Sequence, residues 1–271
     1  MGCAAPPRAP ADFAFALFGD VPYSRAQAHK LDEMIEQMNA EPLAFAVHVG
    51  DITDGSGPCD DAWLEARQRQ FARLAHPFVL LPGDNEWTDC HRSGFDPLER
   101  LAKWRALFCR PVAAISLARQ PGEYCENVRW EAAGFVFAGV NLPGCNNNLG
   151  RTQAMDVEHA TRMRAVFAWL DEARALARGR PGLVVLMQAN PFSLPRAGAN
   201  GYRELLAWLR SATEDPLLNV VLVHGDTHTW RHDEPLPRLR RIEVPGSPEV
   251  RWVRAAIGAQ GLQITLEDPK F

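Results

Sequence analysis

Four apolar runs in the chain end in the same dipeptide, Gly-Asp. The runs are FALFGD, FAVHVGD, FVLLPGD and VVLVHGD, and they place carboxylates at Asp20, Asp51, Asp84 and Asp226. Composition alone would produce about one Gly-Asp pair in such a chain, so the count exceeds chance. A single pair is typical of a turn or a helix N-cap. Four pairs, each at the end of an apolar run, indicate a shared site instead.

Carboxylates gathered in one place repel and raise each other's pKa values, so their joint ionisation requires a compensating cation. A fifth apolar run, LVVLMQ, ends at Gln188, and the fourth Gly-Asp continues to His228. Oxygen donors with one imidazole suit Mn²⁺, Mg²⁺, Fe²⁺ or Zn²⁺. The pattern therefore predicts a site for one divalent metal ion or a pair.

These residues need a sheet that brings the ends of their strands together. In the first half of the chain, apolar runs alternate with helical patterns, and one such pattern places Leu31, Met34, Ile35 and Met38 at i, i+3, i+4 and i+7. This βαβαβ order implies a parallel sheet, whose ligands bind outside the carboxyl ends of the strands. The expected strands are 13–18, 45–49 and 78–81, and the expected helices are 24–38, 61–74 and 97–108.

The second half is expected to add a hairpin around Ala133-Gly134, a long helix over 157–178 and antiparallel strands in the tail, at 240–244, 250–257 and 262–266. A parallel half joined to an antiparallel half predicts an α/β fold of two packed mixed β-sheets flanked by helices, a four-layer αββα sandwich. No repeat or linker divides the sequence. We expect a single domain over residues 1–271, with residues 1–11 as a disordered N-terminus.

Composition excludes several function classes. With 29 Lys and Arg residues against 33 Asp and Glu, the net charge is -4, which leaves no electrostatic footprint for nucleic acid. No apolar run reaches the roughly 18 residues of a membrane span. A small-molecule or other phosphate-ester substrate is consistent with both observations, and the sequence leaves the oligomeric state open.

Six cysteines form no Cys-x-x-Cys pair, so a zinc ribbon or thioredoxin-type site is not indicated. Cys59 and Cys90 each follow a Gly-Asp motif at a similar distance, and either a disulfide or two small apolar side chains would fit there. Gly2-Cys3 followed by Ala and Pro resembles the end of a bacterial lipoprotein signal, the alternative being a flexible N-terminus. These features favour a periplasmic location over a cytoplasmic one.

In motif order and spacing, residues 13–232 resemble the calcineurin-like metallophosphoesterases. That family's motifs read Asp-x-His, Gly-Asp-x-x-Asp, Gly-Asn-His-Glu/Asp, a His ending a strand, and Gly-His-x-His; GDITDG, around Asp51, is the strongest match. The resemblance implies a dinuclear metal-dependent phosphoesterase, a hydrolase in which a metal-activated hydroxide attacks a phosphate ester. The implied ligands are Asp20 and His228 for the first metal, Asp51 as the bridge, and Asp84, Gln188 and Asp226 for the second metal.

The chain departs from that family at five positions. Pro22 stands where the first motif has His, and Tyr23 beside it is a candidate to supply a phenolate or a hydrogen bond instead. Asp84 stands where the family has an Asn ligand. Asn85 stands where the family has the His that contacts the phosphoryl group, so Asn85 is a candidate catalytic and substrate-binding residue. Gln188 and Asp226 each replace a His. The second position becomes nearly all oxygen, which favours Mn²⁺ or Mg²⁺ over Zn²⁺.

Three further residues are candidates for binding the substrate or for transferring a proton to it. His91 is a candidate general acid in place of the missing imidazole, Arg92 a candidate phosphate donor, and Asn141, at the end of an apolar strand, a candidate substrate contact. The departures also motivate an alternative, a non-catalytic metal- or phosphate-binding protein on the same fold. A haloacid-dehalogenase-like phosphatase with Asp20 as nucleophile is disfavoured, because that class needs a second Asp where Pro22 stands.

Overall fold

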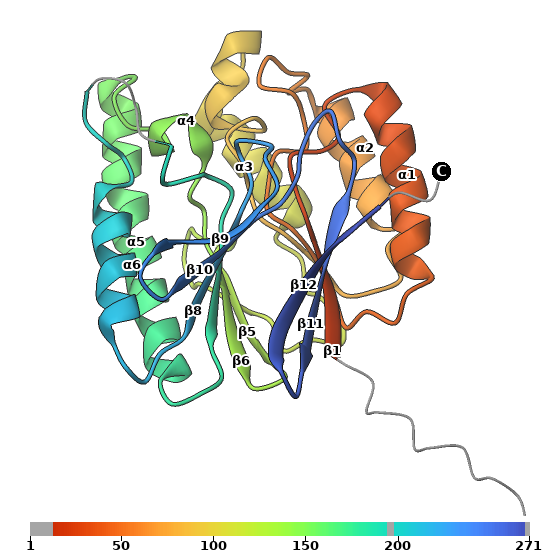
Figure 1. The fold of residues 1–271 in the computed structure, drawn as a ribbon. Coiled ribbons are helices and arrows are strands. Elements are labelled where there is room, and N and C mark those ends of the chain that lie inside the picture. Colours follow the sequence, from red (N-terminus) through yellow and green to blue (C-terminus); the bar gives the residue numbers. More distant parts are fainter. Residues whose placement is uncertain (1–12, 194–197, 269–271) are drawn as a thin grey trace, which may run out of the picture.

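The computed structural model describes residues 13–193 and 198–268, which form two β-sheets packed face to face with helices on both outer faces (Figure 1). The expected N-terminal segment 1–11 and the lipoprotein-like Cys3 lie outside the described residues. One sheet has five strands in the order β12 (Gly261–Glu267), β11 (Trp252–Gly258), β1 (Phe13–Phe18), β2 (Ala46–His48) and β3 (Phe78–Leu80). The other has seven, in the order β4 (Ala118–Arg119), β5 (Val128–Ala132), β6 (Phe135–Gly139), β7 (Leu183–Leu186), β8 (Val220–His224), β10 (Leu239–Glu243) and β9 (Arg231–Leu236).

Both sheets are mixed, as expected. Strands β1, β2 and β3 run parallel, while β11 and β12 pair antiparallel beside them. In the second sheet, β6, β7, β8 and β10 run parallel, and β5 and β9 are antiparallel to their neighbours. The tail was expected to consist of antiparallel strands. Strand β10 pairs antiparallel with β9, as expected, but parallel with β8, so the prediction was wrong for that pairing. Side-chain alternation does not specify which neighbour a strand takes, so the sequence could not resolve this pairing.

Helices cover the outer face of each sheet. On the five-stranded sheet they are α1 (Arg25–Asn39), α2 (Asp61–Phe71) and α3 (Pro97–Phe108), and on the seven-stranded sheet α5 (Gln153–Ala177) and α6 (Arg203–Glu214). Two short elements, η1 (Thr88–Ser93) and α4 (Gly144–Asn147), lie in loops. Helix α1 begins where the sequence predicts, because the Ser24 side chain accepts a hydrogen bond from the Gln27 backbone N–H.

The core between the sheets is rich in aromatic side chains. Phe137 of β6 lies with its ring centroid 5.3 Å from Phe15 of β1, 5.3 Å from Phe45 and 5.0 Å from Trp130 of β5. Contacts of this kind tie the two sheets together and add to the stabilisation from burial alone. The four-layer α/β sandwich predicted from the sequence is therefore the observed fold, and it fixes the relative positions of the strand ends.

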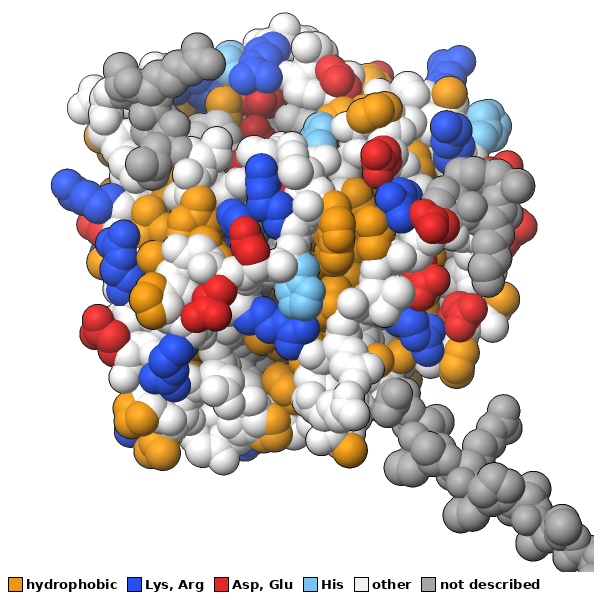
Figure 2. All heavy atoms as spheres, viewed as in Figure 1, with side chains coloured by type: hydrophobic (Ala, Val, Ile, Leu, Met, Phe, Trp, Pro, Cys, Tyr) orange, Lys and Arg blue, Asp and Glu red, His pale blue; other side chains and the backbone are white. Residues whose placement is uncertain are grey.

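No helix in the described part of the chain is long and apolar enough to cross a membrane. Acidic and basic side chains are interspersed over the face shown in Figure 2, without a large area of one sign.

Candidate metal centre

The five predicted strand-end residues follow the carboxyl ends of parallel strands. Asp20, Asp51 and Asp84 follow β1, β2 and β3 of one sheet, while Gln188 and Asp226 follow β7 and β8 of the other. Since the sheets pack face to face, these loops meet at one edge of the sandwich. This is the edge where α/β sheets bind ligands.

Hydrogen bonds join the strand-end residues across the two sheets. Asp20 Oδ1 accepts from the Asp226 backbone N–H at 2.9 Å and lies 3.7 Å from His228 Nε2. Asp51 Oδ2 accepts from Gln188 Nε2 at 2.9 Å. Both links run between loops of different sheets, so the structure brings these predicted residues together.

Asp84 belongs to the same cluster. A methyl group placed on Gly144 would lie 2.7 Å from Asp84 Oδ1 and 2.8 Å from Asp226 Oδ1, so these two oxygens face the same point of the backbone. The charge of Asp226 is also among the causes that raise the pKa of Asp84, after burial itself. We call Asp20, Asp51, Asp84 and Asp226 the carboxylate cluster.

The backbone is left-handed at four of the predicted ligand positions. The φ angles are 54° at Asp20, 64° at Asp51, 78° at Asp226 and 55° at His228. Non-glycine residues adopt such angles uncommonly, and each costs on the order of 1–3 kcal/mol. Strain of this kind is concentrated at functional sites, where it aims side chains that a relaxed backbone would direct elsewhere.

Two glycines make room for the carboxylates. A Cβ on Gly83 would lie 1.9 Å from Asp51 Oδ1, and a Cβ on Gly225 would lie 1.9 Å from Asp20 Oδ2. Neither distance is compatible with a side chain. Gly83 and Gly225 are the glycines of two Gly-Asp motifs, so each glycine creates space for the carboxylate of a different motif.

Burial raises the pKa of every member of the carboxylate cluster. For Asp20, Asp51 and Asp84 burial is the largest cause, and the charges of neighbouring carboxylates add to it. Burial also raises the pKa of Asp226, to about 6. At neutral pH the cluster therefore needs protons or a cation to balance it, and a divalent cation does so without protonating the ligands.

Two oxygens of the cluster are left without a partner. Asp20 Oδ2 and Asp84 Oδ1 are buried and accept no hydrogen bond from the described residues. Buried carboxylate oxygens of this kind are costly unless something satisfies them. With their negative charge, they fit hard divalent cations, so the residues present fit the metal centre that the motifs imply.

The His228 ring is held in the tautomer that a metal ligand requires. Its Nδ1 lies 2.7 Å from the Ser247 carbonyl oxygen, which can only accept, so Nδ1 carries the proton. Nε2 then presents its lone pair towards Asp20 and towards the Tyr23 hydroxyl, 3.0 Å away. Tyr23 donates its single hydroxyl proton to Asp51 Oδ2, at 3.0 Å, so it donates none to Nε2. The phenol thus stands between two predicted ligands of the first metal.

Gln188 lies in the cluster with its nitrogen facing the carboxylates. Its Nε2 donates to Asp51, while its Oε1 accepts from the Gly144 backbone N–H at 2.5 Å. Binding a metal through Oε1 would require the amide to turn over, which would break the bond from Gly144. Gln188 as observed donates a hydrogen bond to the cluster.

Glu86 is a buried carboxylate beside the cluster, and it is not among the residues predicted for the site. Its Oε1 accepts from the backbone N–H groups of Gly83, at 2.7 Å, and Asp51, at 3.3 Å, and so joins two Gly-Asp loops. Burial raises the pKa of Glu86 to about 7. The sequence feature that points to Glu86 is the GDNE motif, in which Glu86 matches the last position of the family's third motif.

The other candidate residues lie in three different settings. Asn85 is buried, and its side chain donates to the Thr53 carbonyl at 2.9 Å. Asn141 is fully buried and donates to Glu126 at 3.1 Å, contacts that favour a packing role over one in substrate binding. His91 is exposed on η1, where its Nδ1 lies 2.9 Å from the Thr88 carbonyl oxygen.

Arg92 contacts residues of two loops that carry members of the cluster. Its half-exposed guanidinium forms an ion pair with Asp89 at 2.7 Å and donates to the Gly55 carbonyl at 3.0 Å. It therefore lies between the loops that follow β2 and β3.

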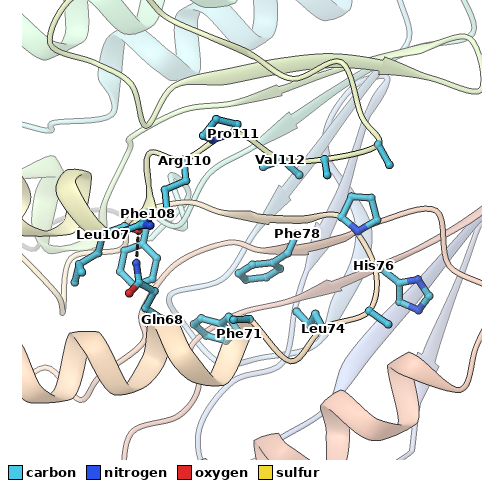
Figure 3. A pocket seen from close by; sticks show the side chains of 15 residues that line it. Gln68, Phe71, Leu74, His76, Phe78, Leu107, Phe108, Arg110, Pro111 and Val112 are labelled. Carbon is cyan, nitrogen blue, oxygen red and sulfur yellow. Dashed lines mark hydrogen bonds between the residues drawn. The ribbon is translucent and has the colours of Figure 1, made fainter.

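A separate pocket of about 460 Å³ lies at the opposite end of β3. Its lining is largely apolar and includes Phe71, Phe78, Leu107, Phe108 and Pro111 (Figure 3). Phe78 is the first residue of β3, whereas Asp84 follows the last. This pocket is therefore distinct from the carboxylate cluster.

The sequence matches no protein-family model and no curated protein. Solved structures are similar over nearly the whole chain. A dimetal phosphatase from Danio rerio is 13% identical with a TM-score of 0.58, over 94% of this chain and 95% of its own. A purple acid phosphatase from yellow lupin, 12% identical, has a TM-score of 0.57, over 96% of this chain and 52% of its own.

A third similar structure bears a different description. The Plasmodium protein GAP50, described as the anchor in the inner membrane complex, is 12% identical with a TM-score of 0.58, over 96% of this chain and 85% of its own. Identities this low establish architecture alone. With two mixed sheets, flanking helices and motif-bearing strand ends as described, the chain has the calcineurin-like metallophosphoesterase fold.

Proposed function

We propose that this protein is a metal-dependent phosphoesterase, a hydrolase of phosphate esters. The observation that carries the proposal is the carboxylate cluster, in which loops of both sheets converge and two buried oxygens have no partner in the described chain. Phosphatases among the similar structures support the same reading. Bound there, a pair of divalent cations would neutralise a phosphoryl group and lower the pKa of a water molecule.

The chain's own residues would hold those cations in two positions. His228, through Nε2, and Asp20 would provide the first, and Asp51 would be shared. Asp84 and Asp226 would provide the second. Gln188 would join them as a ligand if its amide turned over, or it would donate a hydrogen bond to Asp51, as it does in the structure. Because the donors are mainly oxygen, we favour Mn²⁺ over Mg²⁺, Fe²⁺ or Zn²⁺.

Two side chains would act on the substrate. Arg92, half-exposed beside Gly55, would donate to phosphoryl oxygens after exchanging its bond to Asp89. His91, exposed on η1, would protonate the leaving group. Asn85, which we expected to contact the phosphoryl group, would instead fix Asp51, since its backbone N–H donates to Asp51 Oδ1 at 3.1 Å.

The two disulfides support an oxidising compartment. Cys59 is bonded to Cys90 and Cys109 to Cys125. Disulfides of this kind persist outside the reducing cytoplasm, so we propose a periplasmic location.

A hydrolysis screen with a matched variant tests this function. Metal-stripped protein reloaded with Mn²⁺, Mg²⁺ or Zn²⁺ should cleave at least one of a phosphomonoester, a phosphodiester and a pyrophosphate, fastest with Mn²⁺. Asp51→Asn should lose that activity, while Glu33→Gln, an exposed carboxylate on α1, should retain it. Activity that survives Asp51→Asn would contradict the proposal.

A non-catalytic metal- or phosphate-binding protein is the second candidate. The nitrogen that Gln188 presents to the cluster favours it, and so does the anchor described among the similar structures. Metal bound at the cluster without turnover of any ester would support this candidate.

A further inference from the structure

A second group of donors adjoins the carboxylate cluster. One donor atom from each of Asp84, Asp89 and Cys145 lies within 4.8 Å of the other two. They come from three segments, the loop after β3, η1 and α4. Asp89 and Cys145 lie outside the Gly-Asp pattern, so the motifs assign neither of them a role.

Two oxygens of this group are buried and unsatisfied. Asp84 Oδ1 and Asp89 Oδ1 have no hydrogen-bond partner among residues 13–193 and 198–268, and the two residues are 6% and 3% exposed. Arg92 pairs with the other oxygen of Asp89 at 2.7 Å, but it brings one positive charge from a half-exposed side chain to two carboxylates. A cation between the two orphaned oxygens would satisfy both of them.

A left-handed turn presents Cys145 to the carboxylates. Residues 145–148 have φ angles of 49°, 56°, 55° and 64°, a run that L-residues avoid. A hydrogen bond to Tyr202 holds the turn: the Tyr202 hydroxyl accepts from the Asn147 backbone N–H at 3.0 Å. Cys145 is the one free cysteine in the described chain, and the residue is exposed.

We propose that Asp84, Asp89 and the thiolate of Cys145 bind a thiophilic divalent cation, Zn²⁺ or Fe²⁺. The thiol proton leaves to solvent as the sulfur–metal bond forms. A sulfur donor reverses the preference for Mn²⁺ that the oxygen ligands give the rest of the cluster. The inference rests on the proposed metal binding through Asp84, but not on hydrolysis.

Co²⁺ is the probe, because a thiolate ligand gives it a charge-transfer band in the near ultraviolet. The full chain, metal-stripped and with its disulfides intact, is titrated with Co²⁺ in wild-type, Cys145→Ser, Cys3→Ser and Asp89→Asn forms. We expect the band in wild type and in Cys3→Ser, and none in Cys145→Ser. Asp89→Asn should shift the midpoint by at least about tenfold.

Alkylation of Cys145 gives a measurement that needs no variant. Zn²⁺ should slow the reaction of the wild-type thiol with iodoacetamide, and Mg²⁺ at the same concentration should not. No band in wild type, a band that persists in Cys145→Ser, or equal alkylation with and without Zn²⁺ would overturn the site. A charge-transfer band without hydrolysis would support the Cys145 site and contradict the proposed function. Hydrolysis without a band would support the proposed function and contradict the Cys145 site.

Discussion

Asp51 is the residue on which most contacts of the carboxylate cluster converge. Its side chain accepts hydrogen bonds from the Tyr23 hydroxyl, the Gln188 amide and the Asn85 backbone N–H. Each donor stabilises the ionised carboxylate, but burial still raises the pKa of Asp51 well above its usual range. Three donors therefore do not fully compensate the burial of this carboxylate. A cation beside Asp51 would stabilise its ionised form further.

Restoring an imidazole at position 188 should strengthen metal binding. In Gln188→His, a nitrogen lone pair would replace an amide that now presents N–H groups to the cluster. We expect Mn²⁺ affinity at the second position to rise by at least about tenfold. Isothermal titration calorimetry measures this, with Gln68→His on α2 as the control. Unchanged affinity in Gln188→His would show that position 188 does not face a metal.

His91 is tested by comparing two kinds of leaving group. If it is the general acid, His91→Ala should lower the rate on an alkyl phosphate by about 10²–10⁴-fold, because that leaving group needs a proton. On an activated aryl ester the loss should be small. Equal losses on both would indicate a role in binding or in the structure of η1, and no loss on either would exclude His91.

At the scale of elements, the disulfide between Cys59 and Cys90 joins the loops that follow β2 and β3. The Cα atoms lie 5.7 Å apart and the residues 31 positions apart in sequence. These loops carry Asp51 and Asp84, so the bond constrains two members of the carboxylate cluster. The bond between Cys109 and Cys125, 16 positions apart, lies away from these loops and provides a matched comparison.

Removing either disulfide should lower stability, but only one removal should weaken metal binding. We expect Cys59→Ser/Cys90→Ser and Cys109→Ser/Cys125→Ser each to lose about 2–4 kcal/mol of unfolding free energy. Only the first should also bind Mn²⁺ more weakly, because it frees the loops of Asp51 and Asp84. Urea unfolding and metal titration of both variants measure the two effects. Equal metal affinity in both would contradict this role.

Helices and strands follow the sequence prediction most closely where periodicity and capping agree. Helix α1 and strands β1 to β3 lie where the apolar patterns place them, because Ser24 and the Gly-Asp motifs mark their ends. Helix α5 begins at Gln153, four residues before the predicted start, because the Thr152 side chain caps it by accepting from Met155 N–H. Propensity does not show which of several polar residues acts as the cap.

Other features depend on tertiary contacts and could not be predicted locally. The left-handed turn over 145–148 appears in the sequence only as a Gly followed by Cys and three Asn residues. It is held by Tyr202, which lies more than 50 residues later in the chain. The orientation of Gln188, which decides whether oxygen or nitrogen faces the carboxylates, likewise depends on the Gly144 backbone N–H.

At the scale of the whole molecule, the two sheets place the cluster at their common edge. The core around Phe137 fixes one sheet against the other, so loops of both sheets meet at fixed distances. Similar structures keep this arrangement at 12–13% identity, and among them are phosphatases and one protein described as an anchor. The fold therefore provides the site, and the residues in it determine whether chemistry follows.

Metal analysis of the purified protein tests the central claim, that the carboxylate cluster binds divalent metal ions. The chain, dialysed against Mn²⁺ and then against metal-free buffer, should retain metal in wild type and in Glu33→Gln, which changes an exposed carboxylate on α1. Asp51→Asn, which removes the shared carboxylate but preserves side-chain shape, should retain far less. Equal metal content in Asp51→Asn and Glu33→Gln would contradict the account, because the cluster could then not be where the metal binds.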